Sequence, residues 1–466
     1  MNKKKVTIIL MVFIAIFSTF VFVKNNSNVE ITNEINNKSK KNNDLLTMNL
    51  EQTAGTGDYK TVTKSSWPTK GYKFNPELSK CEKGSELSWD DTKKAVIMQG
   101  NVSDKCYVYF DIWIPSIADY CSSGTDLATC VKNFGNQGPD ISNIYIHNSS
   151  LDNGAGDNSY RYAGGNYELT DKGKLTGAST IPYEDEKKTS LIDFYCDGTK
   201  QFVGSWCAST KTSYYQIKGD TTEYQTYDDA LSASLEKGYL TINEVYNYMC
   251  FGTNETPCPE INRYRIIGVI DGKVKVIKAT SIGDMAWNTN GSNTWSASSL
   301  NTYLNNDYLN TFDDITKEKI SQTTWKVGGT DGISLIHYTG LSEVYEYEFG
   351  TKAPEETYGA KIGLMYLSDY GFGAAPSTWA YKLIDFDRSL SGDVIGIYFW
   401  LHSDMISEWT ISREGTDRFA NYVYISGSGQ YDIASTKYGV RPVFYLNQNV
   451  NYVGGTGTSS DPIRIN

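Results

Sequence analysis

The sequence has few of the groups that metal sites and nucleophilic active sites use. It contains 3 histidines, His147, His337 and His402, which lie far apart in the chain, and it has no C-x-x-C pair and no H-E-x-x-H motif. Both absences argue against a zinc site. No G-x-S-x-G motif accompanies a histidine, so a serine triad has no support either. We therefore expect no metal, no cofactor and no catalytic residue.

An excess of positive charge is also missing. The chain carries 43 Lys and Arg against 54 Asp and Glu, a net charge of −11. Nucleic acids and anionic lipid head groups need a basic face, so the composition excludes them as general partners. With 466 residues, 39% of them hydrophobic, the chain is long enough for two or three domains. Its 35 tyrosines and 10 tryptophans suit β-rich packing and ligand contact alike.

The N-terminus has the pattern of a targeting segment. Lysines at positions 3–5 precede an apolar run, residues 6–23, that ends before Lys24. As a helix this run is about 27 Å long, close to the roughly 30 Å hydrocarbon core of a bilayer. Bulky residues at 20–23 do not form an A-x-A cleavage site. We expect an uncleaved single-pass anchor in the cell membrane with the bulk of the chain outside; a cleaved signal peptide is the alternative.

The number of cysteines is even, which agrees with an oxidising location. The simplest pairing joins neighbours in sequence. The predicted disulfides are Cys81 with Cys106, Cys121 with Cys130, Cys196 with Cys207, and Cys250 with Cys258.

Composition shifts divide the chain into five segments. We expect the anchor at 1–23, a polar disordered stalk at 24–58, a small disulfide-stapled β-rich module at 59–165, an inserted segment at 166–245 and an α+β domain at 246–466. The fold class is thus β-rich α+β with an N-terminal membrane helix.

Several elements can be predicted within these segments. Residues 85–89 and 95–100 indicate a β-hairpin, with a further strand at 106–113 beside it. The insert contains a hairpin around Cys196 and Cys207 and a helix near 227–237.

The C-terminal segment has the clearest pattern. Two β runs flank the turn Asp271-Gly272, which is a strong hairpin signal. A helix is expected at 298–310, and Asp313 is the expected cap of another. Further strands are expected at 363–369, 408–413 and 438–446.

The order of segments 295–300, 364–369, 408–413 and 439–446 resembles a bacterial domain-of-unknown-function family of exported proteins. Its members end with a Gly-Val-Arg-Pro strand, here Gly439 to Pro442. The resemblance covers about residues 246–466. It implies a C-type-lectin-like α+β domain, distantly related to the formylglycine-generating, sulfatase-modifying enzymes, with long loops over a twisted sheet.

The region from 398 to 413 is the candidate ligand site, because it concentrates aromatic and polar side chains suited to sugars or peptides. The candidate residues are Trp400, His402, Asp404, Glu408, Trp409 and Arg413. The alternative is that both tryptophans are core residues and that Arg413 forms a structural ion pair. The Glu-Pro-Asn and Gln-Pro-Asp motifs of calcium-dependent lectins are absent, which argues against calcium-dependent sugar binding.

These features favour a non-catalytic binding module for glycan, envelope or host components, with fold analogy as the main support. Its expected partners are the membrane, through the N-terminal helix, and a glycan or protein ligand. One alternative is an enzyme of the envelope, either a hydrolase or an oxidase of the sulfatase-modifying kind. The oxidase would need a reactive cysteine, and none follows Cys258. The other alternative is a structural subunit of a surface array.

Overall fold

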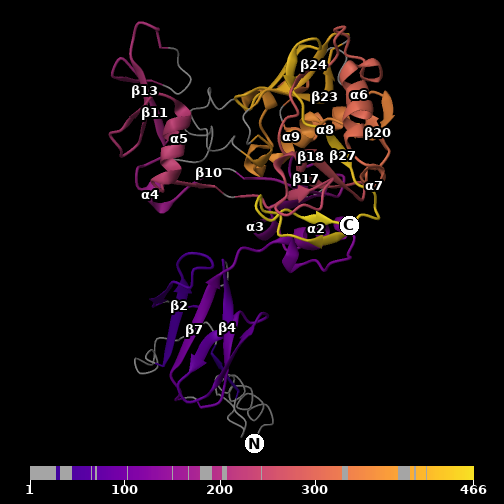
Figure 1. The fold of residues 1–466 in the computed structure, drawn as a ribbon. Coiled ribbons are helices and arrows are strands. Elements are labelled where there is room, and N and C mark those ends of the chain that lie inside the picture. The colour runs from indigo at the N-terminus through magenta and orange to yellow at the C-terminus, as the bar shows by residue number, and fades with distance from the viewer. Residues whose placement is uncertain are drawn as a thin grey trace, which may run out of the picture. The chain divides into compact units, whose positions relative to one another are not determined.

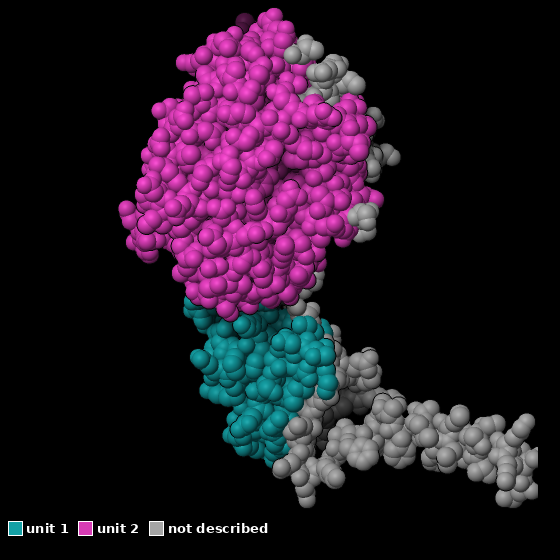
Figure 2. Space-filling model, turned by 90° about the vertical axis from the view of Figure 1, so that its right-hand side faces the viewer, with its two compact units in different colours: residues 1–115 teal, residues 116–466 magenta. Residues whose placement is uncertain are grey.

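The protein forms two compact units in the computed structural model, residues 1–115 and residues 116–466, which are coloured separately in Figure 2. The structure describes residues 28–466 except 32–44, 64–65, 69–70, 102, 149–150, 166, 179–190, 202–206, 243, 328–333, 339, 387–398, 403–405 and 416.

Unit 1 is built from two small sheets around one core. The first has the order β3-β2-β7-β4 and the second the order β1-β6-β5. The strands are β1 (Asn28–Ile31), β2 (Leu46–Glu51), β3 (Tyr59–Val62), β4 (Tyr72–Cys81), β5 (Glu86–Asp90), β6 (Ala95–Gln99) and β7 (Cys106–Ile112). The predicted hairpin at 85–100 is confirmed as β5 paired with β6. The strand predicted beside it, β7, instead pairs with β2 and β4.

The predicted disordered stalk at 24–58 differs from the structure in two places, the first of which is residues 28–31, the strand β1 that pairs with β6. Residues 46–51 form β2, which runs parallel to β7. Met48 and Leu50 alternate with more polar residues and are buried against Val108 and Phe110 of β7. The alternation of apolar residues thus outweighs the polar composition around it.

Unit 2 contains a seven-stranded sheet and a five-stranded sheet. The first has the order β22-β27-β18-β17-β9-β8, with β16 also paired to β17. Figure 1 labels three of its strands, β17, β18 and β27. Its strands are β8 (Ile144–His147), β9 (Ser159–Tyr162), β16 (Tyr248–Cys250), β17 (Arg263–Ile270), β18 (Lys273–Lys278), β22 (Ile362–Gly363) and β27 (Val443–Tyr445). The predicted Asp271-Gly272 hairpin is confirmed between β17 and β18, where both turn residues have positive φ, 50° and 73°.

The five-stranded sheet contains part of the candidate ligand region, residues 408–413. Its strand order is β19-β26-β23-β24-β25. The strands are β19 (Asp284–Ala286), β23 (Glu408–Glu414), β24 (Phe419–Val423), β25 (Gly429–Ile433) and β26 (Lys437–Gly439). Two pairs of short strands accompany the large sheets, β20 (Thr323–Lys326) with β21 (Thr357–Ala360), and β28 (Tyr452–Gly454) with β29 (Arg464–Ile465).

Short helices cover these sheets. They are α2 (Leu127–Gly135), α3 (Pro139–Ser142), α6 (Ser299–Tyr303), α7 (Asp314–Lys319), α8 (Leu341–Glu348) and α9 (Leu367–Gly373). The expected cap is confirmed, since the Asp313 side chain accepts a hydrogen bond from the Thr316 amide at 2.7 Å. The strand expected at 363–369 is wrong over most of its length, because α9 begins at Leu367 and Asp369 accepts the Tyr366 amide at 2.9 Å.

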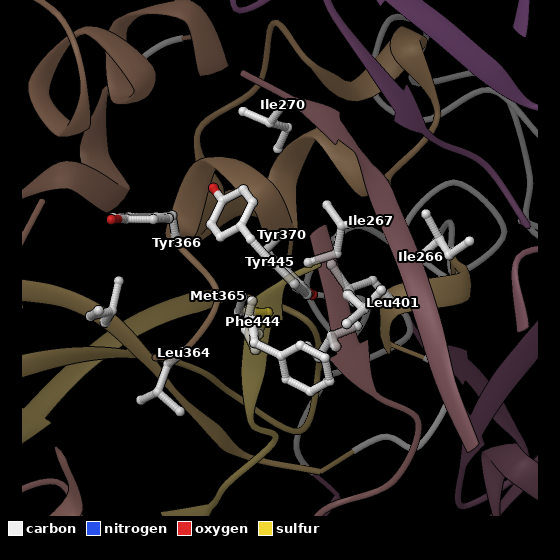
Figure 3. Packing of buried hydrophobic residues seen from close by; sticks show 14 of the residues in the cluster. Ile266, Ile267, Ile270, Leu364, Met365, Tyr366, Tyr370, Leu401, Phe444 and Tyr445 are labelled. Carbon is white, nitrogen blue, oxygen red and sulfur yellow. The ribbon is translucent and has the colours of Figure 1, made fainter. Parts of the chain in front are cut away.

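The main core of unit 2 lies where these elements meet. Figure 3 shows side chains of β17, of β27 and of the segment that leads into α9 packing together. Buried residues such as Ile117, Phe134 and Ala163 belong to this core, and β9 pairs with β17. The structure therefore divides the chain near residue 115, whereas the sequence suggested that the β-rich module extends from 59 to 165.

The inserted segment has a core of its own, formed by residues between Tyr167 and Leu240. Its elements are β10 (Tyr167–Leu169), α4 (Asp171–Lys174), β11 (Ile192–Cys196), β12 (Thr199–Gln201), β13 (Ser213–Ile217), β14 (Glu223–Tyr224), α5 (Tyr227–Glu236) and β15 (Leu240–Ile242). The predicted helix near 227–237 is confirmed as α5. A separate core explains why this segment can interrupt the domain.

The four disulfides predicted from sequence proximity are confirmed. Cys81 pairs with Cys106, Cys121 with Cys130, Cys196 with Cys207, and Cys250 with Cys258. The first bond joins directly opposed residues of β4 and β7.

The prediction of an N-terminal membrane helix, and with it a single-pass location in the cell membrane, must be corrected. Over the part of the chain that is described, no helix has the length and apolar character to cross a bilayer. One of the longest, α5, has 10 residues and spans about 15 Å, half of the roughly 30 Å required. Residues 1–23, to which the anchor was assigned, lie outside the described residues. The fold that is observed is β-rich and disulfide-bonded.

Candidate functional site

The candidate residues from the 398–413 region are mostly in the interior. Trp400, His402, Glu408 and Trp409 are between 1% and 3% exposed. Asp404 lies outside the described residues. These buried side chains contribute to the fold, and their hydrogen bonds show how.

The two tryptophans are core residues, the alternative considered for them. Trp400 Nε1 donates to the Tyr162 carbonyl at 3.2 Å, and the guanidinium of Arg265 lies 4.8 Å from the Trp400 ring. Trp409 Nε1 donates to the Met285 carbonyl at 2.9 Å. Because each indole N–H has a backbone partner inside the protein, both rings are fixed in place.

The charged candidates form ion pairs. Arg441 Nε donates to Glu408 Oε2 at 2.6 Å, and Arg441 Nη2 also donates to the Leu401 carbonyl at 2.6 Å. Arg441 is the arginine of the Gly-Val-Arg-Pro segment, so this buried pair ties that segment to the start of β23. Arg413 Nη1 lies 2.9 Å from Glu356 Oε2.

His402 and Ser407 form hydrogen bonds with the turn between β24 and β25, which lies at the surface. His402 Nε2 lies 3.2 Å from the Ile425 carbonyl oxygen, and Ser407 Oγ accepts the Ile425 amide at 3.1 Å. The turn presents Tyr424 and Ile425, which are 42% and 45% exposed. The candidate region therefore supports an exposed apolar group that lies elsewhere in the sequence.

Tyr424 belongs to a group of three tyrosines on the five-stranded sheet, which we call the tyrosine patch: Tyr422, Tyr424 and Tyr438. The Tyr422 and Tyr438 rings stack with centroids 4.1 Å apart and an interplanar angle of 13°. Tyr424 meets Tyr422 edge-on at 6.4 Å. Trp409 packs edge-on against Tyr438 at 4.9 Å. Trp409 thus supports the patch from the interior.

Polar groups border the patch. Tyr438 OH donates to Asp432 Oδ2 at 2.8 Å, and Gln430 stands opposite Tyr422 in the β24–β25 register. Burial, together with the neighbouring Tyr422 and Asp432, raises the pKa of Tyr438, and burial also raises the pKa of Tyr422. Both phenols therefore keep their protons at neutral pH and act as uncharged hydrogen-bond donors.

A second group of charges is sealed in the interior. Asp369 accepts from Arg161 Nη1 at 3.0 Å and from the Lys275 ammonium, and all three side chains are at most 2% exposed. Although burial alone would raise the pKa of Asp369, Lys275 and Arg161 lower it. Asp157 lies 3.1 Å from Arg161 Nη2, so two carboxylates face the two cations and the charges balance, as buried ion networks must to be stable.

No cluster of three or more His, Cys, Asp or Glu side chains suited to a metal ion occurs among residues whose positions are described.

None of the three tyrosines of the patch was predicted from the sequence. The signal that could have revealed two of them is the alternation Tyr422-Val423-Tyr424, which places both tyrosines on one face of a strand. Tyr438 could not be linked to them from the sequence, because the pairing of β26 with β23 is set by the tertiary fold.

Part of the chain matches a known protein family. Residues 271–448 match the family described as "Domain of unknown function (DUF6273)". The five-stranded sheet and the tyrosine patch lie within this region. No curated protein matched the chain, and no solved structure did.

Proposed function

We propose that the chain is a non-catalytic carbohydrate-binding protein that contacts sugar rings through the tyrosine patch. The observation that carries the proposal is the exposed Tyr424, 42% accessible, next to two stacked tyrosines that a buried tryptophan supports. A sugar presents a face of C–H groups that packs on aromatic rings, while its hydroxyls require hydrogen-bond partners at the rim.

The rim groups have the right chemistry for those hydroxyls. Gln430 is half-buried and has both a donor and an acceptor. Asp432 accepts one hydrogen bond from Tyr438, and a carboxylate has capacity for more. Because the phenols are uncharged, the patch favours a neutral ligand surface over an ionic one.

The scaffold is rigid where the proposed contact lies. The stacked rings of Tyr422 and Tyr438 both meet the Trp409 ring edge-on, and this aromatic cluster links β23, β24 and β26. A preformed surface loses little conformational entropy on binding. The hypothesis of kinship with C-type-lectin-like and sulfatase-modifying folds is separate, and the proposal does not depend on it.

The test is a screen of the purified chain against a carbohydrate array, followed by calorimetry with the strongest ligand. Tyr424→Ala should weaken binding about ten-fold, which corresponds to about 1.4 kcal/mol and is within the range measured for aromatic contacts. Tyr431→Ala is the matched control, because Tyr431 is 45% exposed but packs against Phe419, opposite Asn421 and away from the patch.

The control variant should bind within about two-fold of the wild type. If no carbohydrate binds, or if both variants lose affinity equally, the proposal is wrong. Binding of a protein in place of a sugar would show that the patch is a protein-docking surface instead.

A further inference from the structure

A second, separate feature of unit 2 is a cavity of about 370 Å³ between the loop that follows β16, helix α7 and the strands β28 and β29. Side chains that line it include Thr253, Asn254, Ile315, Lys319, Val453 and Arg464. Its volume lies near the lower end of ligand pockets, which span about 300–1,000 Å³. It can therefore hold a small molecule.

One wall of the cavity is a covalently closed loop. The Cys250–Cys258 disulfide spans residues 251–257. The Asn262 side-chain amide donates to the Phe251 carbonyl at 2.9 Å, and the Cys250 amide donates to the Ile463 carbonyl at 2.9 Å. The loop is thereby fixed both to the turn that precedes β17 and to the segment before β29.

The opposite wall is α7, which is held at both ends. Asp313 caps its first turn, and at its end the Lys319 carbonyl accepts the Asn447 amide at 2.9 Å. Ile315 on this helix is 71% exposed and Val453 on β28 is 48% exposed. Two aliphatic side chains thus remain open to solvent beside the cavity, where a ligand would cover them.

The polar side of the cavity has an excess of positive charge. Lys319 and Arg464 form no ion pair with any carboxylate among the described residues. Asp313 is the one carboxylate in the lining; the hydrogen bonds from Thr316 and the charges of Lys319 and Lys317 lower its pKa, and it can balance one of the two cations that line the cavity. Lys317, on the same helix, differs from Lys319 in both respects. It forms an ion pair with Asp314 at 3.3 Å, and it does not line the cavity.

We propose that this cavity binds a small aliphatic carboxylate, with the carboxylate between Lys319 and Arg464 and the hydrocarbon chain against Ile315 and Val453. Guanidinium and ammonium groups form charge-assisted hydrogen bonds with a carboxylate, and Arg464 has the planar donor pair for a bidentate contact. The site shares no residue with the tyrosine patch and is independent of carbohydrate binding.

The test is calorimetric titration of the full chain with hexanoate as the probe, with hexanol and inorganic phosphate as comparison ligands. Hexanoate should bind saturably and about ten-fold or more tightly than either. Hexanol lacks the charge, and phosphate lacks the hydrocarbon chain. Equal binding of hexanol would overturn the role of the two cations, and equal binding of phosphate would overturn the role of the aliphatic wall.

Lys319→Gln and Arg464→Gln should each weaken hexanoate binding about ten-fold. Lys317→Gln is the matched control, since it removes the same charge from the same helix without altering the lining, and it should leave affinity unchanged. Unfolding temperatures of all three variants establish that they are folded. Absence of hexanoate binding to the wild type, or an equal loss in Lys317→Gln, would refute the proposal.

Discussion

A buried histidine and a buried glutamate should give the protein opposite responses to acid. His147, at the end of β8, is fully buried between the rings of Phe372 and Trp379, with centroids 4.7 and 4.8 Å away. Its Nδ1 accepts the Ala155 amide at 3.1 Å. The site thus holds a neutral imidazole and has no place for a second proton.

Burial, together with the positive charge of Arg161, lowers the pKa of His147 from 6.5 to about 3. Below pH 6.5 the unfolded chain binds a proton that the folded chain does not. The stability that His147 contributes is therefore complete above pH 6.5 and is lost as the pH falls towards 3. The loss is about 1.4 kcal/mol per pH unit, or about 2 kcal/mol between pH 6.5 and about 5.

Glu348, the last residue of α8, works in the other direction. Its carboxyl group accepts the amides of Leu367 and Ser368, each at 3.0 Å, and burial raises its pKa from 4.5 to about 7. Between these two values the folded chain holds a proton that the unfolded chain has released. Stability from Glu348 therefore increases as the pH falls through this range, by about the same 1.4 kcal/mol per unit.

In the wild type His147 and Glu348 change the unfolding free energy in opposite directions between pH 4.5 and 6.5. Replacing one of the two residues at a time should reveal the contribution of the other. When the pH falls from 6.5 to about 5, the unfolding free energy of Glu348→Gln should decrease by about 2 kcal/mol relative to the wild type. That of His147→Asn should increase by about 2 kcal/mol. Asn at position 147 retains an acceptor for the Ala155 amide. The loss of the packed imidazole ring lowers the unfolding free energy by an amount that does not depend on pH.

The assay is urea unfolding of both variants and the wild type at several pH values, with disulfides intact. The quantity compared is the change with pH in the unfolding free energy of unit 2. The reasoning is refuted if both variants follow the wild-type slope across this range, because neither side chain would then titrate differently in the folded and unfolded states.

Two further predictions concern the framework of unit 2. Arg441→Met should lower the unfolding free energy by about 3–5 kcal/mol, since it removes the buried cation that neutralises the Glu408 carboxylate. Urea unfolding of the double variant with Glu408→Gln should recover part of this free energy, and no recovery would contradict the prediction. Replacing Cys250 and Cys258 with Ala removes a bond of sequence separation 8 and should cost about 2.5 kcal/mol, measured by thermal unfolding without reductant; an unchanged unfolding temperature would disprove it.

The features that could be predicted from the sequence are those that local chemistry determines. The Asp271-Gly272 turn needs two residues that tolerate positive φ, and Asp313 needs only the amide three residues later. The disulfides joined cysteines that are 8 to 25 residues apart. In each case the interacting groups are close in the chain.

The candidate site was harder to predict from the sequence, because its side chains are positioned by residues that are distant in the chain. Glu408 looks like a surface group in the sequence, yet it is buried because Arg441, 33 residues away, neutralises it. Trp409 is covered by Tyr422 and Tyr438, which come from two other strands. Composition showed that aromatic and polar groups were present, but burial depended on the tertiary fold.

The proposal that sugar rings pack on the tyrosine patch is tested most directly by saturation-transfer NMR with the strongest ligand from the carbohydrate array. Selective irradiation of the protein's aromatic protons should transfer saturation to the C–H protons of one face of the sugar. At equal ligand concentration Tyr424→Ala should reduce that transfer, while Tyr431→Ala leaves it intact. Transfer that is absent in the wild type, or that survives unchanged in Tyr424→Ala, would contradict the proposal.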